Sequence, residues 1–143
     1  MTKKILVIDD EPSICEMLQD ILTENGYYVE YALNGIKGLE LINRINPDVI
    51  LVDIWMPELN GINLLGLINQ HQYKVSTILM SANASSQIID KGMQMGAYSF
   101  LKKPLKIDLL LETIEKALMP ISEFTILIEN VCPPGFNNYP KEN

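Results

Sequence analysis

The chain lacks the features that would mark it as a disulfide-rich, secreted or membrane-spanning protein. It has only two cysteines, Cys15 and Cys132, which lie far apart and form no metal-ligand pattern. We therefore interpret them as free thiols of a reducing compartment. No apolar run approaches the roughly eighteen residues of a membrane span, and the run at 5–8 is too short for the core of a signal peptide. These absences favour a cytoplasmic protein with no membrane contact.

Basic residues are also scarce. The chain has 11 Lys and Arg against 18 Asp and Glu, which gives a formal net charge of −7. Phosphate backbones are bound by clustered Lys and Arg, and the one short basic cluster is Lys102, Lys103 and Lys106. The charge therefore argues against direct binding of nucleic acid. The length of 143 residues favours one domain that can bury its own core.

Short apolar runs alternate with amphipathic segments as far as residue 118. The runs are rich in β-branched residues and predict strands at 4–8, 27–32, 48–53, 75–80 and 98–101. Helical spacing of apolar residues, bounded by Pro, Gly and Asn, predicts helices at 11–25, 36–45, 61–70, 85–95 and 107–118. The first helix should bury Ile14, Leu18, Ile21 and Leu22. The fourth contains Gly92, which weakens a helix by about 1 kcal/mol relative to Ala.

This alternation predicts the fold class. Five strand–helix repeats are typical of an α/β protein with a doubly wound, parallel five-stranded sheet covered by helices on both faces. The strand order 2-1-3-4-5 is one of the two common solutions. We expect residues 1–118 to form this domain and residues 119–143 to form a tail or the start of a truncated linker, in which 121–128 could pack or extend the last helix.

Polar residues follow four of the five predicted strands. Asp9 and Asp10 follow the first strand, and Asp53 ends the third. Ser81 and Lys103 follow the fourth and the fifth. The carboxyl ends of parallel strands share one edge of the sheet, and the order 2-1-3-4-5 puts the first and third strands side by side. We therefore expect the three carboxylates to converge.

Three neighbouring carboxylates need a counter-charge. Mg²⁺ suits oxygen ligands of this kind and usually works beside a phosphoryl group. Ser81 could donate a hydrogen bond to a phosphoryl oxygen, and Lys103 could supply a positive charge. With a carboxylate as the nucleophile, the set predicts phosphorylation of Asp53.

Each residue also has an ordinary structural interpretation. A lone Asp after a strand is commonly a turn former or a helix cap, and Asp9-Asp10-Glu11 could complement the dipole of the following helix. Ser81 could cap a helix, and Lys103 could be a solvated charge. The combination at four strand ends of one sheet favours the chemical interpretation.

Five sequence pieces occur together in a fixed order: Ile5-Leu6-Val7-Ile8-Asp9-Asp10-Glu11, Asp53-Ile54-Trp55-Met56-Pro57-Glu58-Leu59-Asn60-Gly61, Met80-Ser81-Ala82, Gly96-Ala97 and Lys103-Pro104. With these pieces the chain resembles the receiver domains of bacterial two-component response regulators. Each piece is weak alone, but the set is highly specific. The resemblance implies a flavodoxin-like (βα)₅ fold. It also implies a signalling switch, not an enzyme, that takes a phosphoryl group from a sensor histidine kinase or a phosphotransfer protein.

The resemblance also implies roles for single residues. Asp53 corresponds to the phosphoacceptor, and Ser81 to the hydroxyl residue that turns toward the phosphate. Asp10 corresponds to a direct Mg²⁺ ligand and Asp9 to its neighbour, which binds through water. The main-chain carbonyl of Trp55 would complete the protein's share of the metal ligands.

At the end of the fifth strand, Lys103 matches the family's lysine because it directly precedes Pro104, and the resemblance implies a cis peptide bond between them. Phe100 occupies the aromatic switch position, where Tyr is commoner. Trp55 and Asn83 follow Asp53 and Ser81 by two residues, at positions where family members differ in dephosphorylation rate. A bulky Trp55 could shield an acyl phosphate, so we expect slow autodephosphorylation.

Phosphorylation adds nearly two negative charges, which should draw in Ser81 and Lys103. The face formed by the helix at 85–95, the strand at 98–101 and the last helix should then shift and signal to a downstream protein or an output domain. A phosphorylation-dependent dimer is possible.

Two alternatives remain open from the residues alone. A flavodoxin-like cofactor domain would need a Ser/Thr/Gly-rich loop in place of Asp9-Asp10-Glu11. An inert, receiver-like interaction scaffold would be expected to lack an acid or the lysine. The only histidine, His71, is expected to be a solvated residue near a helix end.

Overall fold

The computed structural model describes residues 2–71 and 73–120. Within them the strands are β1 (Lys4–Ile8), β2 (Tyr28–Ala32), β3 (Val49–Asp53), β4 (Ser76–Ser81) and β5 (Ser99–Lys102). The helices are α1 (Pro12–Glu24), α2 (Gly35–Ile45), α3 (Gly61–Gln70), α4 (Ser86–Gln94) and α5 (Ile107–Leu118). Every predicted element exists, and each boundary lies within one residue of its predicted position. The predictions for 121–128 and Cys132 concern parts of the chain outside the described residues.

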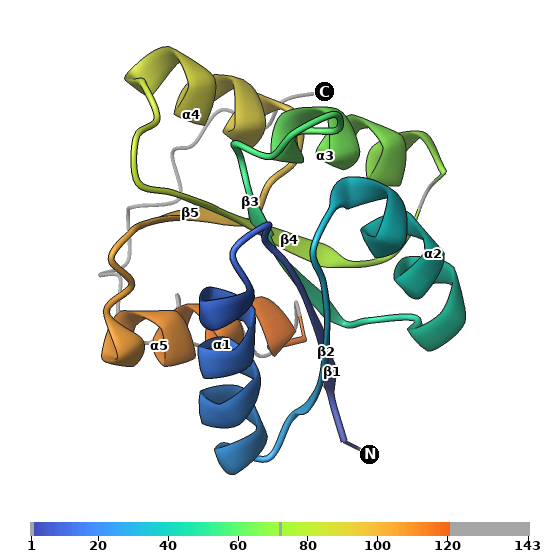
Figure 1. Cartoon of the computed structure of the whole chain (residues 1–143), viewed down its shortest axis with the longest axis vertical. Helices are drawn as coiled ribbons and strands as arrows, with labels where there is room; N and C mark the ends of the chain where they lie inside the picture. Colours follow the sequence, from blue (N-terminus) through green and yellow to red (C-terminus); the bar gives the residue numbers. More distant parts are fainter. Residues whose placement is uncertain (1, 72, 121–143) are drawn as a thin grey trace, which may run out of the picture.

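The five strands form one parallel sheet in the order β2-β1-β3-β4-β5, as predicted. Figure 1 shows α1 and α5 on one side of the sheet and α2, α3 and α4 on the other. Every strand therefore delivers its carboxyl end to the same edge, and β1 lies beside β3 at the point where the winding reverses. No helix in the described part of the chain has the length and apolar character needed to cross a membrane.

Two apolar cores lie against the two faces of the sheet. Alternate residues of a strand point to opposite faces, so Leu6 and Ile8 join the core beneath α2, α3 and α4. Ile5 and Val7 join the core beneath α1 and α5. All five residues of β3 are buried, as expected of a central strand covered on both sides. The sheet edge that carries the polar residues is thus held on a rigid base.

Short polar side chains start three of the helices. Asn34 Oδ1 accepts a hydrogen bond from the main-chain N–H of Lys37 at 2.8 Å, and Asn60 Oδ1 accepts one from Asn63 at 2.8 Å. Ser85 Oγ accepts the corresponding bond in α4. These caps satisfy main-chain donors that have no partner inside the helix. The loop residues thereby fix where α2, α3 and α4 begin.

The buried face of α1 differs from the prediction by about one residue. The structure buries Cys15, Leu18 and Leu22, whereas Ile14 and Ile21 are only half-buried. Positions 15, 18 and 22 follow the helical repeat as well as the predicted stripe does. The predicted stripe was therefore partly wrong: the buried face is centred nearer Cys15, so Ile14 and Ile21 lie at its margin.

Helix α4, which the sequence predicted to be weak because of Gly92, has the fewest fully buried residues of the five helices. Only Gly92 is fully buried in it, and a Cβ atom there would lie 2.4 Å from Leu79 Cδ1. The glycine thus lets α4 approach the sheet closely. At the end of α4, the side-chain amide of Asn69 donates a hydrogen bond to the main-chain oxygen of Met95, and Met95 packs against the core.

Candidate functional site

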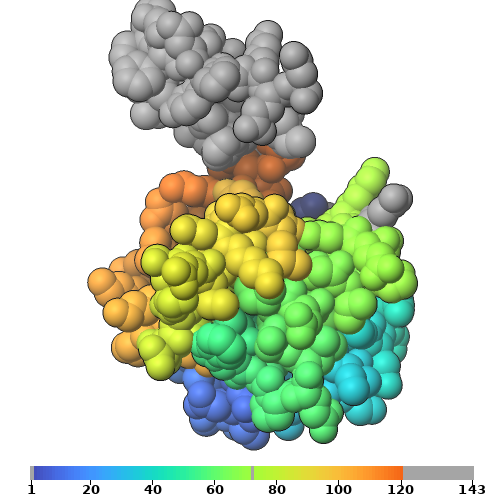
Figure 2. Space-filling view, turned by 90° about the horizontal axis from the view of Figure 1, so that it is seen from above, coloured from blue at the N-terminus to red at the C-terminus, as the bar shows by residue number. Residues whose placement is uncertain are grey.

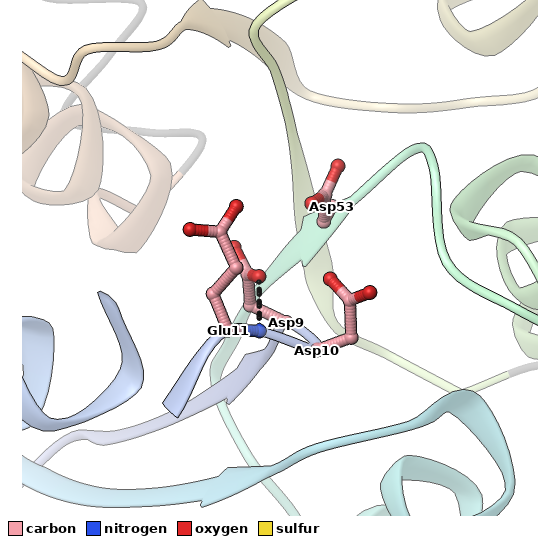
Figure 3. Close-up of side chains that lie close together, drawn as sticks. All are labelled: Asp9, Asp10, Glu11 and Asp53. Carbon is pink, nitrogen blue, oxygen red and sulfur yellow. Dashed lines mark hydrogen bonds between the residues drawn. The ribbon is translucent and has the colours of Figure 1, made fainter. Parts of the chain in front are cut away.

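Four acidic side chains gather at the carboxyl edge of the sheet. One carboxylate oxygen from each of Asp9, Asp10, Glu11 and Asp53 lies within 4.8 Å of the others, and Figure 3 shows them around one space between the first loop and β3. Asp9 is fully buried and Asp53 is 6% exposed, whereas Asp10 and Glu11 face solvent. The predicted convergence of Asp9, Asp10 and Asp53 is therefore present in the structure.

Local hydrogen bonds hold Asp9 in place. Its main-chain N–H donates to Ala32 of β2 at 3.1 Å, and its Oδ1 accepts a bond from the N–H of Glu11 at 3.0 Å. Its main-chain oxygen accepts a bond from Cys15 Sγ at 3.3 Å. Burial, reinforced by the negative charge of Asp9, raises the pKa of Cys15 to about 12. The thiol therefore stays protonated and remains a donor.

Asp53 owes its position to a tight return of the loop that follows β3. The N–H of Gly61 donates to the oxygen of Ile54 at 2.9 Å, and a Cβ atom at Gly61 would lie 2.5 Å from the main-chain oxygen of Asp53. Any larger residue would push the loop away. Within this loop Glu58 adopts a positive φ of 69°, a left-handed conformation that is unfavourable for most residues with a side chain.

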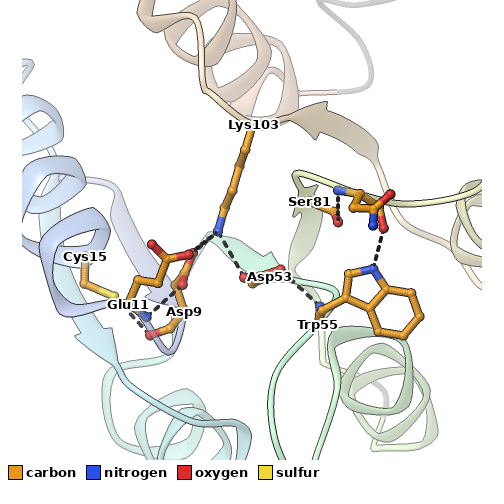
Figure 4. A network of polar contacts seen from close by, with 8 residues as sticks. Asp9, Glu11, Cys15, Asp53, Trp55, Ser81 and Lys103 are labelled. Atoms are coloured by element: carbon orange, nitrogen blue, oxygen red, sulfur yellow. Dashed lines mark hydrogen bonds and ion pairs between the residues drawn. The ribbon is translucent and has the colours of Figure 1, made fainter.

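Lys103 joins the buried acids. Its Nζ lies 2.6 Å from Asp9 Oδ2 and 3.0 Å from Asp53 Oδ2, and its side chain is 9% exposed. Glu11 Oε1 lies further away, at 3.9 Å. Figure 4 shows the lysine reaching from the end of β5 between the two acids. Lys102 is exposed instead, and the peptide bond from Lys103 to Pro104 is cis.

The positive charge of Lys103 does not fully offset the effect of burial on Asp53. Burial raises the pKa of Asp53, and the hydrogen bond from Lys103 offsets this only in part. Burial alone would lower the pKa of Lys103, but its bonds to Asp9 and Asp53 outweigh burial and raise it. The lysine is therefore a stable ammonium group. An ionised Asp53 would be favoured further by another cation.

A second set of hydrogen bonds leads from Asp53 to Ser81. The N–H of Trp55 donates to Asp53 Oδ1 at 3.0 Å, and the indole Nε1 of Trp55 donates to the main-chain oxygen of Asn83 at 2.8 Å. The N–H of Asn83 donates in turn to Ser81 Oγ at 3.1 Å. Figure 4 shows this chain beside the lysine. Ser81 is 1% exposed, and the cap of α4 is Ser85 rather than Ser81.

Sequence reasoning missed two features of the site. It singled out Trp55 and Asn83 by position but not their contact, and it gave Glu11 no role. The only signal for Glu11 was its place directly after two acids. Phe100 is half-buried and packs against the core on the α4 side. His71 is exposed at the end of α3, as predicted.

Comparison with known proteins bears on this site. A family model of the response regulator receiver domain matches residues 5–115. The chain belongs to this family. It is 36% identical over 119 residues to the chemotaxis protein CheY of Bacillus subtilis, a match that covers 82% of this chain and 99% of that protein. It is 35% identical over 115 residues to the regulatory protein AtoC of Escherichia coli, of which it spans only 25%.

Solved structures agree with this assignment. The chemotaxis protein CheY4 of Vibrio cholerae superposes with a TM-score of 0.77 at 31% identity, over 82% of this chain and all of that one. The flavodoxin-like fold expected from the resemblance is thereby confirmed. Receiver domains of this family are signalling switches and not ordinary enzymes.

Proposed function

We propose that Asp53 accepts a phosphoryl group from a sensor histidine kinase or a phosphotransfer protein. The observation that supports this most is the buried Asp53 carboxylate, which lies 3.0 Å from a buried ammonium group. Three further acids, Asp9, Asp10 and Glu11, share the same sheet edge. Burial favours neutralisation of the Asp53 carboxylate by a bound ligand. Its place at the end of a strand gives the phosphoryl donor access to it.

The transfer itself needs one nucleophile. An oxygen of Asp53 attacks phosphorus, a new P–O bond forms, and the P–N bond of the donor's phosphohistidine breaks with release of the imidazole. Lys103 neutralises charge on the transferred oxygens. Ser81 turns its hydroxyl from Asn83 toward one of them. The product is an acyl phosphate on Asp53.

The acidic group fits Mg²⁺, because all four of its side chains offer carboxylate oxygens within 4.8 Å of one another. Asp10 and Asp53 would hold the ion directly, Asp9 through water, and the main-chain oxygen of Trp55 would complete the set. When bound, such an ion neutralises charge that develops on phosphoryl oxygens. Glu11 adds a further carboxylate at the solvent side.

The output is a shift of the α4–β5–α5 face. Ser81 and Lys103 lie at the ends of the two strands that flank α4, and α4 has few buried side chains to resist movement. Figure 2 shows α4, in yellow, between the green α3 segment and the orange residues near α5. Met93 of α4, Tyr98 directly before β5 and Leu109 of α5 are each exposed by 38–48%.

A groove of about 370 Å³ on this face is lined by Leu101, Lys102, Lys103, Pro104, Leu105, Lys106 and Leu109. It gives a downstream protein, an output domain or a second phosphorylated copy of the chain both apolar and basic contacts.

The test is phosphorylation by acetyl phosphate, followed by intact-mass spectrometry. The wild-type chain should gain one phosphoryl group in the presence of Mg²⁺ and lose it on treatment with hydroxylamine, which cleaves acyl phosphates. Asp53→Asn should gain none, whereas Asp20→Asn, which changes an exposed acid of α1, should label normally. Chelation with EDTA should suppress labelling. Full labelling of Asp53→Asn would refute the assignment, and no labelling of the wild type would favour an inert interaction scaffold.

A further inference from the structure

Trp55 makes hydrogen bonds from both its main chain and its side chain, and the two bonds reach different strand ends. Its N–H binds the Asp53 carboxylate at 3.0 Å, and its indole binds the Asn83 carbonyl of the β4–α4 loop at 2.8 Å. We propose that Trp55 is a positioning residue whose indole latches the β4–α4 loop in its unphosphorylated place and restrains Ser81 until Asp53 is phosphorylated. This inference rests on the proposed function of Asp53.

The latch is linked to the hydroxyl that the reaction requires. Asn83 accepts the indole bond through its oxygen and donates through its own N–H to Ser81 Oγ at 3.1 Å. Both groups belong to one residue, so movement of Ser81 toward a phosphoryl group and breakage of the indole bond involve the same short loop. Among the contacts of the described residues, Asn83 links Trp55, which binds Asp53, to the hydroxyl of Ser81.

Packing does not account for the position of the indole. Trp55 is 50% exposed, although its large apolar ring would gain most from burial. Its one polar group is a donor with a well-placed acceptor. The hydrogen bond therefore directs the half-exposed ring toward the β4–α4 loop.

The far end of α4 is anchored more firmly than the latched end. Gly92 lies against Leu79, and the Asn69 amide binds the main-chain oxygen of Met95. At the N-terminal end of α4, the residues before the Ser85 cap are exposed or half-buried and small, apart from Asn83. Release of the Trp55 latch should thus move the N-terminal end of α4 about its C-terminal end.

Three full-length proteins test the latch: the wild type, Trp55→Phe, which keeps a ring but loses the N–H donor, and Asn83→Ala. The alanine variant is a matched control, because Asn83 takes part in both bonds through its main chain. Hydrogen exchange of the loop amides at 82–86 in the unphosphorylated proteins should be about three- to tenfold faster in Trp55→Phe, the effect of one lost hydrogen bond. Asn83→Ala should exchange like the wild type, and all three should melt at similar temperatures.

A second measurement uses the fact that Trp55 is the only tryptophan of the chain. In protein already saturated with Mg²⁺, its emission should change when acetyl phosphate is added to the wild type, and should not change in Asp53→Asn. Equal exchange in the wild type and Trp55→Phe, or unchanged emission in a protein shown by mass to be phosphorylated, would refute the latch while leaving the proposed function intact. If the wild type is not phosphorylated at all, the proposed function fails, and the exchange experiment still decides whether the indole restrains the loop.

Discussion

Replacing Lys103 with methionine should destabilise the fold and make its stability depend on Mg²⁺. The change removes the ammonium group that lies 2.6 Å from Asp9 and 3.0 Å from Asp53 but keeps an unbranched, apolar stem of similar length. Asp9 is fully buried and Asp53 nearly so. The variant therefore leaves two neighbouring carboxylates out of water without a counter-charge.

The expected loss follows from this burial. Removing one partner of a buried ion pair costs about 3–5 kcal/mol, and the lower end applies because a proton or a sodium ion can partly compensate at a sheet edge. A loss of about 3 kcal/mol should lower the melting temperature by roughly 10 °C. With an m-value of about 2 kcal/mol/M in urea, the unfolding midpoint should fall by about 1.5 M.

The assay is urea unfolding, followed by far-UV circular dichroism, with EDTA and with excess Mg²⁺. An ion present at about 100 times its dissociation constant stabilises a protein by roughly 2.7 kcal/mol, so Mg²⁺ should recover most of the loss. Lys102→Met is the matched control, because this neighbouring lysine is exposed; it should unfold like the wild type.

The pH dependence supplies a second check. Burial already raises the pKa of Asp53, and the bond from Lys103 opposes that rise. Without the lysine, the folded-state pKa of Asp53 should climb further above its unfolded value. The contribution of Asp53 to stability should then be greatest below its unfolded-state pKa and be lost as pH rises through its folded-state pKa. If Lys103→Met is as stable as Lys102→Met in EDTA at neutral pH, the electrostatic account of the site is wrong.

Three further outcomes are expected. Trp55→Ala should shorten the half-life of phosphorylated Asp53, because the ring no longer screens it from water; an unchanged half-life in a time course of intact mass would remove this idea. Glu58→Asn should raise stability by about 0.5–1 kcal/mol in urea unfolding, since Asn tolerates the positive φ of 69° better than Glu, and a destabilised variant would contradict the strain. Cys15 should resist iodoacetamide at pH 8.5 in the folded protein, because its pKa is raised to about 12, and peptide mapping that finds it alkylated would show that the thiol is accessible.

The sequence determines the frame of the site more completely than its detail. Alternating patterns predicted a parallel sheet, in which the strand ends that carry Asp9, Asp53 and Lys103 share one edge. The order 2-1-3-4-5, one of two common solutions, placed the strands of Asp9 and Asp53 side by side. These positions follow from backbone topology alone. The acids could therefore be placed without knowing a single side-chain angle.

Loop contacts could not be placed in the same way. The indole bond of Trp55 to the Asn83 carbonyl depends on how two loops return to the sheet, and the first return depends on Gly61 lying against the Asp53 carbonyl. No residue pattern reports such a direction. Similarly, the apolar spacing of α1 fits both the predicted stripe and the observed face through Cys15, so the spacing alone could not select the buried face.

The charge balance of the site connects the acidic edge of the sheet with the weakly packed helix α4. Four carboxylates share the edge with one ammonium group, so an incoming dianionic phosphoryl group meets net repulsion until a divalent cation is bound. Once attached, its oxygens would compete with Asp9 for Lys103 and would accept a hydrogen bond from the Ser81 hydroxyl, drawing it away from the Asn83 N–H. Both changes are local, and both act at the ends of β4 and β5, the strands that α4 connects. Because α4 has only Gly92 fully buried, little packing energy would oppose the proposed movement, and a change of about two charges at Asp53 would bias it.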